Sequence, residues 1–279
     1  MSQIGAHVSA AGGVAKAPSN AHAEGLETFQ MFSRSPQSFQ CPVLTADMVA
    51  LFLHNVQQYG FKQYYIHAPY LVNIASASNR LRHGSITMLR QELDRGSRLM
   101  VRGVMFHTGS AASQPSRRAA LTTAGKSLNQ ILQGYQGSCL LLLENAAGSG
   151  SVLGCSLNEL AQLYRSIKPA YRKYVGFCID TQHAFGSGYD LRTKANVNQF
   201  VRQIDQQLGL KKLIVIQAND SKVSFDSKKD RHEHIGQGYI GAAAFGYMLQ
   251  HPKLKHLDYI LETPLAGRSE DIAILKKLR

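Results

Sequence analysis

The sequence has no tryptophan, only four cysteines and no long apolar run, and the last two shortages exclude whole classes of protein. Its longest apolar stretches, such as Cys139 to Leu143, are far too short to cross a bilayer, and the first residues lack the basic start and apolar core of a secretion signal. The four cysteines form no C-x-x-C pair, which argues against a disulfide framework or a zinc finger. We therefore expect a cytoplasmic protein with reduced thiols that neither spans a membrane nor is visibly secreted.

Acidic residues are also scarce, because 18 Asp and Glu stand against 31 Lys and Arg and leave a net charge of +13 with His neutral. Such an excess favours a polyanionic partner, either nucleic acid or a phosphorylated ligand. Hydrophobic residues still make up 44% of the 279 residues, so a substantial core is possible and global disorder is excluded. No linker, low-complexity segment or short repeat divides the chain, and we expect one domain over residues 1–279 that acts as a monomer.

Short β-branched or aromatic runs alternate with longer amphipathic stretches along the whole chain. Eight such βα units in a chain of this length favour a closed parallel (β/α)8 TIM barrel over an open doubly wound sheet. The predicted strands are Ile4 to Val8, Thr28 to Phe32, Tyr64 to His67, Gly103 to His107, Cys139 to Glu144, Val175 to Asp180, Leu213 to Asp220 and Tyr259 to Glu262. The predicted helices are Gly13 to Glu24, Ala46 to Tyr59, Asn79 to Val101, Ser116 to Gln133, Leu157 to Ile167, Ala195 to Leu208, Ala242 to Leu249 and Ser269 to Leu278.

Six of the predicted strands finish on acids, imidazoles or amides. These polar residues are His67, His107, Glu144, Asp180 with His183 shortly after it, the segment Gln217 to Asp220, and Glu262. In a barrel the C-terminal ends of all strands lie around one mouth, where the active sites of this fold are found. Gathering so many acids and imidazoles without a cation would leave costly unpaired polarity, so the pattern predicts bound metal. Imidazole and carboxylate ligands without thiolate suit Zn²⁺, Mn²⁺ or Fe²⁺.

A further polar cluster, from Lys228 to Gly236, precedes the last strand. Asp230 and His232 alternate there in an extended segment, so both side chains can point the same way and hold one ion. His234 shares that parity. We leave His234 out because a compact site rarely takes three ligands from five consecutive residues.

With these residues identified, the sequence resembles the endonuclease IV family, zinc-dependent endonucleases that act at apurinic and apyrimidinic sites. The likeness runs over nearly the whole chain, and its strength lies in an ordered set of specific motifs. They are residues 4–13 (IGAHVSAAGG), His67-Ala68-Pro69-Tyr70, His107-Thr108-Gly109-Ser110, residues 143–148 (LENAAG), residues 178–185 (CIDTQHAF), Asn219-Asp220-Ser221-Lys222, Asp230-Arg231-His232 and Leu261-Glu262-Thr263-Pro264.

The resemblance implies three Zn²⁺ ions at the mouth of the barrel. His67 and His107 match ligands of the first ion, and Glu144 bridges it to the second. Asp180 and Glu262 match ligands of the second ion, and Glu262 also stands where the family positions the attacking water. Glu144 and Glu262 are thus the expected catalytic residues. The implied reaction cuts the phosphodiester 5′ to an abasic sugar in double-stranded DNA, leaving a 3′-hydroxyl and a 5′-deoxyribose phosphate, and also removes 3′-blocking groups.

His183, Asp230 and His232 match the ligands of the third ion, but the sequence departs from the family at the second. Gln217 stands where the family usually has a metal-binding His, and no His occurs between His183 and His232 to replace it. An amide oxygen is a weaker ligand than imidazole. A second site made only of oxygens favours harder ions. We therefore expect the second ion to bind less tightly, or Mn²⁺ to serve better than Zn²⁺ there.

Two loops at the mouth have the composition of DNA contacts. The loop from Phe32 to Phe39 mixes a cation, hydroxyls and an aromatic ring, which suits phosphate contacts and a wedge into the base stack. Tyr70 and Leu71 follow His67 directly and can fill the gap left by a missing base. In the family the first of these loops usually carries an Arg where Gln37 stands, so cations elsewhere should strengthen the grip on the lesion. The expected ones are Arg34, Lys222, Lys228 and Lys229.

Two other readings remain open on the sequence alone. A sugar isomerase of the xylose isomerase type also gathers Glu, Asp and His around metal in a barrel, but a small neutral sugar gives no reason for a charge of +13. A lesion-binding protein without activity is the second alternative, with Gln217 as the mark of a decayed metal site.

Overall fold

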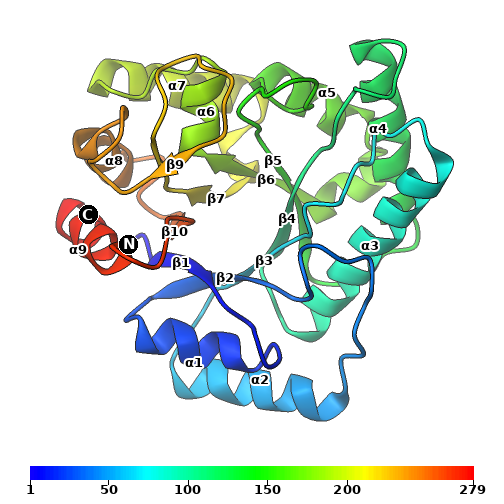
Figure 1. Cartoon of the computed structure of the whole chain (residues 1–279), viewed down its shortest axis with the longest axis horizontal. Coiled ribbons are helices and arrows are strands. Elements are labelled where there is room, and N and C mark those ends of the chain that lie inside the picture. Colours follow the sequence, from blue (N-terminus) through cyan, green and yellow to red (C-terminus); the bar gives the residue numbers. More distant parts are fainter.

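The eight main strands close into a barrel at the centre of the computed structural model, which describes all 279 residues (Figure 1). Every neighbouring pair of barrel strands is parallel, and the last strand pairs back with the first. In barrel order they are β1 (Ile4–Val8), β2 (Thr28–Phe32), β3 (Tyr65–His67), β4 (Gly103–His107), β5 (Leu140–Glu144), β6 (Val175–Asp180), β7 (Leu213–Gln217) and β10 (Asp258–Leu261). The predicted TIM barrel is confirmed.

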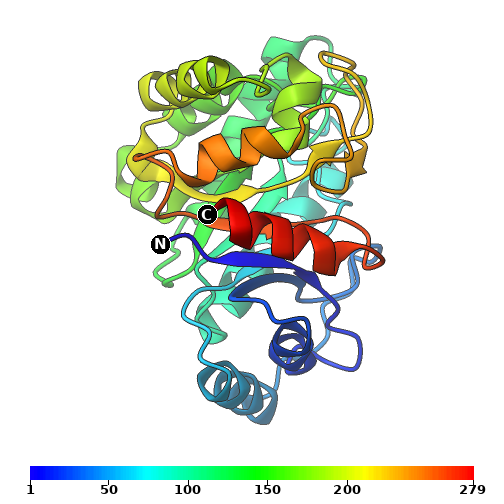
Figure 2. The same ribbon diagram turned by 90° about the vertical axis from the view of Figure 1, so that its left-hand side faces the viewer.

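Helices surround the strands on the outside of the barrel, and Figure 1 shows them in chain order from α1 and α2 at the lower edge to α8 and α9 at the left. Their bounds are α1 Lys16–Ala23, α2 Ala46–Gln58, α3 Asn79–Arg98, α4 Arg117–Leu132, α5 Leu157–Ser166, α6 Thr181–Ser187, α7 Lys194–Gln207, α8 Ala242–Leu249 and α9 Arg268–Leu278; the short 3₁₀ turns η1 (Pro169–Tyr174) and η2 (Leu210–Lys212) lead into β6 and β7. The closing helix α9 lies along β1, so the two ends of the chain meet (Figure 2). No helix combines the length and the apolar character needed to cross a bilayer.

Side-chain caps set the starts of several helices. Thr45 and Ser156, for example, have extended backbones and accept the free backbone N–H groups of Met48 and Glu159. A hydroxyl in this position satisfies one of the donors that the first helical turn leaves without a partner. Each of these two helices therefore begins at its expected residue.

The inside of the barrel is filled by apolar side chains. Tyr65, Met105, Leu142, Cys178, Val215 and Ile260 are fully buried and form one cluster there. A larger apolar cluster fills the space between the strands and the surrounding helices. The polar residues at the C-terminal strand ends therefore stand on a packed apolar layer, which holds their backbones in place.

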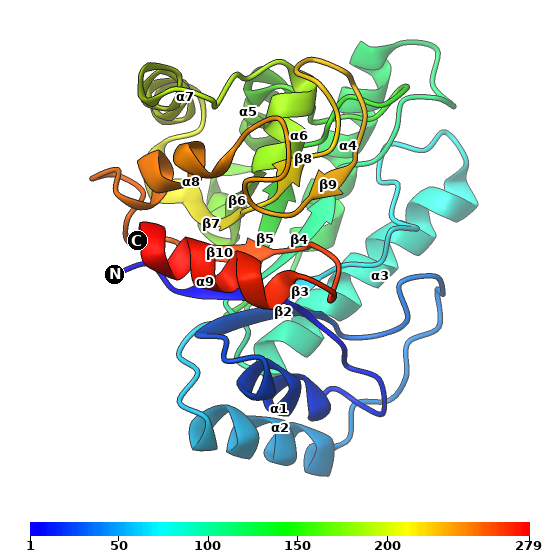
Figure 3. The same cartoon turned by 60° about the vertical axis from the view of Figure 1, so that its left-hand side comes forward.

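The structure differs from the sequence prediction around β7. We expected one strand to run on to Asp220, but β7 ends at Gln217, and Asp220–Ser221 forms a separate strand, β8, antiparallel to β9 (His232–Glu233) beside α6 (Figure 3). The Asp220 carboxylate explains the change, because it accepts the backbone N–H groups of Ser221, Gly236, Gly238, Ile240 and Gly241. These hydrogen bonds stabilise Asp220 outside the barrel wall and hold the β9 segment over the mouth.

Candidate metal centre

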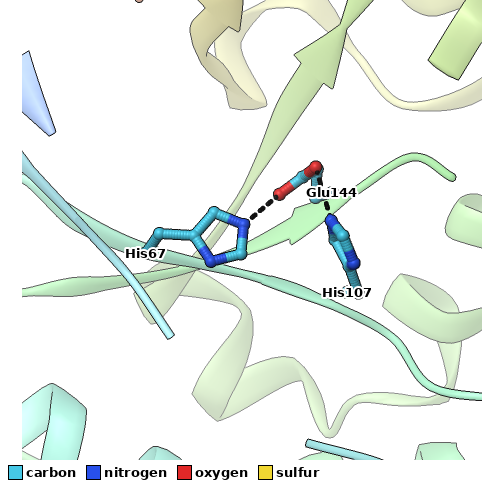
Figure 4. Close-up of side chains that lie close together, drawn as sticks. All are labelled: His67, His107 and Glu144. Atoms are coloured by element: carbon cyan, nitrogen blue, oxygen red, sulfur yellow. Dashed lines mark hydrogen bonds and ion pairs between the residues drawn. The ribbon is translucent and has the colours of Figure 1, made fainter. Parts of the chain in front are cut away.

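The first cluster of predicted ligands is His67, His107 and Glu144, which come from the neighbouring strands β3, β4 and β5 (Figure 4). The Nε2 atom of His67 lies 3.1 Å from one carboxylate oxygen of Glu144, and that of His107 lies 3.0 Å from the other. Glu144 is fully buried, while the His107 side chain is 35% exposed toward the mouth. One residue at the end of each of three paired strands thus forms a single compact donor set.

The acids of this cluster favour positive charge on its imidazoles. The Nδ1–H of His67 donates to the Ala68 carbonyl at 2.7 Å, and its Nε2 faces the Glu144 carboxylate, so both ring nitrogens face acceptors. Burial alone would lower the pKa of His67, but Glu144 and Glu262 outweigh it and raise that pKa to about 9. Burial likewise acts to raise the pKa of Glu144, yet three imidazoles hold it well below its ordinary value. A divalent ion can supply the same positive charge, with the imidazoles and the carboxylate as its ligands.

The second cluster contains Asp180, His183 and His232, with Asp230 beside them. Asp180 ends β6 and caps α6, because its Oδ1 accepts the backbone N–H of His183 at 2.8 Å. This cap turns the chain into a seven-residue helix that faces His183 back toward the strand ends. The sequence analysis missed α6, since so short a helix gives almost no apolar periodicity. His232 arrives from β9 on the neighbouring ribbon.

Two buried nitrogens in this second cluster have no hydrogen-bond partner. The Nδ1–H of His183 donates to the Asn145 carbonyl at 2.9 Å, and its Nε2 lies 3.2 Å from Asp230 without a hydrogen bond. His232 Nε2 also lacks a partner, 3.4 Å from Asp230 and 3.6 Å from Asp180. Because a carbonyl holds the Nδ1–H of His183, the Nε2 atom of that ring is the one that can bind a metal, as in other metal-binding histidines. The residues of both clusters therefore fit divalent metal.

The two clusters adjoin each other, since His183 Nδ1 lies 3.3 Å from Glu144. Two asparagines that the sequence analysis did not assign hold them in register. Asn145 bonds both the N–H and the C=O of Asp180, while Asn219 donates to the Asp180 carboxylate at 2.6 Å and accepts the N–H of Glu262 at 2.8 Å. In the sequence, Asn145 directly follows Glu144 and Asn219 directly precedes Asp220, and these neighbouring acids were the only signal that could have identified the two asparagines.

Glu262 stands outside the two clusters. The Glu262 carboxylate accepts a hydrogen bond at 2.6 Å from Gln30, and Gln217 contacts Gln30 and Cys178. Burial and the nearby Glu144 raise the pKa of Glu262. His234, which the sequence analysis left out of the site, pairs through its ring with Asp271 on α9, at 2.8 Å.

Most of the predicted DNA contacts lie on the surface. Tyr70 is 61% exposed and Leu71 39%, and the Tyr70 ring stands 5.5 Å from that of His67. The other exposed members are Gln37, Lys222, Lys228 and Lys229, although the Lys228 ammonium also pairs with Asp226.

The prediction for Arg34 is wrong. Its side chain is fully buried, with Nε bonded to Glu92 and Nη1 to Gln91 on α3, so it cannot reach a phosphate. Arg95 belongs to the same buried polar network, because its guanidinium donates to the hydroxyl and the carbonyl of Ser33. The loop composition gave no sign that Arg34 would turn inward, toward an acid on a helix.

Replacing Glu92 with Gln should lower the free energy of unfolding by about 3 kcal/mol or more, because the buried Arg34 guanidinium then loses its only carboxylate. The Ser33 hydroxyl, which accepts a hydrogen bond from Arg95, also loses its charged acceptor. Urea unfolding followed by circular dichroism measures the change. The matched control, Gln91→Ala, removes one partly exposed hydrogen bond and should cost under about 1 kcal/mol. Equal effects of the two substitutions would show that the buried charge is not important.

Comparison with known proteins agrees with the fold and the motifs. The model of the xylose isomerase-like TIM barrel family matches residues 18–278. A probable endonuclease 4 of Chlorobium phaeobacteroides is 36% identical over 279 residues, which cover 99% of this chain and 97% of that protein. Among solved structures, endonuclease IV from Thermus thermophilus superimposes with a TM-score of 0.85 at 32% identity, covering 99% of this chain and 98% of that one. A D-tagatose 3-epimerase-like protein reaches a TM-score of 0.76 at 18% identity, covering 99% and 96%, which shows a shared fold alone.

Proposed function

The chain belongs to the endonuclease IV family, and we propose that it is a metal-dependent DNA repair enzyme that cuts the phosphodiester 5′ to an abasic site. The observation that carries the proposal is the meeting of two buried imidazole and carboxylate clusters at the barrel mouth, in a chain with endonuclease 4 relatives. The products would be a 3′-hydroxyl and a 5′-deoxyribose phosphate, and the same chemistry would remove 3′-blocking phosphates and phosphodiesters.

Bound divalent ions, for which Zn²⁺ is the first candidate, would activate a water, neutralise the phosphate and stabilise the departing oxygen. The protein supplies the fixed surroundings. Ala68 and Asn145 orient His67 and His183 through their Nδ1–H groups, and Glu144 joins the two clusters. Glu262, aligned by Gln30 and Asn219, would accept the proton of the attacking water. Its raised pKa supports this role, because a general base works best when its pKa lies near the working pH.

Tyr70 and Leu71 are the side chains best placed to recognise the lesion. Both are exposed at the mouth, and Tyr70 lies directly against the first cluster. An aromatic and an aliphatic side chain can enter the base stack where a base is missing and can hold the bare sugar at the metal centre.

Nicking of an abasic duplex oligonucleotide tests this function, with an undamaged duplex as control. A single cut that leaves a 3′-hydroxyl supports the proposal. Binding without any cut would favour the inactive lesion-binding protein. Conversion of a ketose by the same preparation, without nicking, would favour the sugar isomerase. The sugar-converting enzyme compared above is similar to this chain in fold alone.

Binding of abasic duplex should weaken steeply with salt, because lysines around the mouth neutralise phosphates. Replacing Lys222 and Lys229 together with Ala should reduce the slope of log K against log salt by about 1.8, at about 0.9 per phosphate contact. Fluorescence anisotropy between about 50 and 200 mM salt measures that slope. The control variant, Lys62→Ala with Lys211→Ala, removes the same charge before β3 and β7, at the other end of the barrel. Equal slopes in both variants would refute the assignment.

A further inference from the structure

Two glutamines lie side by side inside the barrel, next to the metal centre. Gln30 comes from β2 and Gln217 from β7, and both are fully buried. The Nε2 atom of Gln217 lies 3.3 Å from Oε1 of Gln30. The Gln30 amide in turn reaches Glu262 at 2.6 Å and His7 Nδ1 at 2.9 Å. A continuous chain of amides therefore links Gln217 to the Glu262 carboxylate.

The partners of this chain determine which way each amide faces. A carboxylate only accepts hydrogen bonds, so Gln30 presents its NH₂ group to Glu262 and its oxygen to Gln217. Gln217 must then donate, and its NH₂ group faces Gln30. The oxygen of Gln217 is left to accept from the buried thiol of Cys178, 3.2 Å away. The atom of Gln217 that carries lone pairs therefore points toward the apolar interior of the barrel.

The carboxylates that a second ion would need are directed to the two clusters or to N–H donors. Both oxygens of Glu144 face imidazoles of the two clusters. Asp180 accepts the N–H of His183 with one oxygen and the amide of Asn219 with the other. A metal ion at this position would have to displace the N–H donors from both oxygens of Asp180. It would also meet the NH₂ group of the Gln217 amide, which is hydrogen-bonded on both sides.

We propose that the chain binds two metal ions and not three, because the Gln30 and Gln217 amide pair takes the place of the second ion that the family resemblance implies. The inference rests on the proposed function, since it concerns the ions of the same site. The Glu262 carboxylate then accepts the hydrogen bond from Gln30 in place of a contact to the second ion. Each of the two clusters, around His67 with His107 and around His183 with His232, holds one ion.

Native mass spectrometry of the full chain, loaded with excess Zn²⁺ and then desalted, counts the ions directly. We expect two per chain in the natural protein. The double variant Gln217→His with Gln30→Ala restores an imidazole and removes its amide partner, and we expect three. Gln217→Glu, which changes the size of the side chain very little, provides a second route to three ions if the double variant does not fold. Gln114→His, on the loop before α4, is the control and should stay at two.

Three ions in the natural protein would overturn the proposal, and so would a count of two in every folded Gln217 variant. Incision of abasic duplex, measured on the same samples, separates this outcome from a failure of the proposed function. Three ions with nicking would leave the endonuclease in place and remove the amide argument. Two ions without nicking would support the amide argument and contradict the proposed endonuclease function.

Discussion

Replacing Glu144 with Gln is expected to lower kcat/KM for abasic incision by about 10³-fold or more, the scale seen when an enzyme loses a group that stabilises charge in the transition state. The buried carboxylate lies within 3.0 to 3.3 Å of three imidazoles, those of His67, His107 and His183, and it joins both clusters. An amide of the same shape carries no charge and turns an N–H group toward one of the imidazoles. Single-turnover nicking with excess enzyme isolates the chemical step, and metal analysis of the same variant should show lost ions.

The control for this substitution is Glu27→Gln, at the opposite end of the barrel. Glu27 precedes β2, pairs with Arg279 and accepts the N–H of Ile4. Its loss should alter stability slightly and leave incision within about twofold, the usual range for a surface substitution away from the site. Near-normal incision by Glu144→Gln, with the protein folded, would remove Glu144 from the mechanism.

Sequence reasoning could bring the candidate ligands together because strand ends in a barrel converge on one mouth. His67, His107 and Glu144 could be placed together without coordinates, since each closes an apolar run and the parallel pairing brings the ends into line. Asp230 and His232 required more, because the ribbon that carries them depends on the five backbone hydrogen bonds of Asp220. Only the short spacing of the two residues hinted at a shared ion.

Side chains whose partners lie far along the chain could not be placed in this way. Arg34 turns inward to Glu92, 58 residues away, and a Glu on an amphipathic helix looks like a surface residue until its face is known. Gln30 contacts Glu262, 232 residues away, and Gln217, 187 residues away. A single Gln within an apolar strand is expected to face the barrel interior. The local sequence gives no sign that the amides of Gln30 and Gln217 meet there.

Removing metal with a chelator should abolish incision and lower the Tm by about 7 °C for each ion lost. An ion present at about 1,000 times its Kd adds about 4 kcal/mol to the folded state, and a chain of this size shifts its Tm by about 1.7 °C per kcal/mol. Differential scanning calorimetry with and without chelator measures the shift, and added Zn²⁺ should restore both the Tm and nicking. The variant His232→Asn, which removes one unpartnered nitrogen of the second cluster, should show a smaller shift than the natural protein.

The pH dependence of metal binding tests the same centre independently of DNA. Neighbouring acids, acting against burial, raise the pKa of His67 to about 9 without metal, so below that pH the ring carries a proton that must leave before Nε2 can bind an ion. Apparent Zn²⁺ affinity should therefore rise with pH up to about 9, by as much as about tenfold per pH unit for one displaced proton. Competition with a chelator of known affinity at several pH values gives the slope. A flat profile between about pH 7 and 9 would mean that the ion does not displace this proton, and His67 would then not be a ligand.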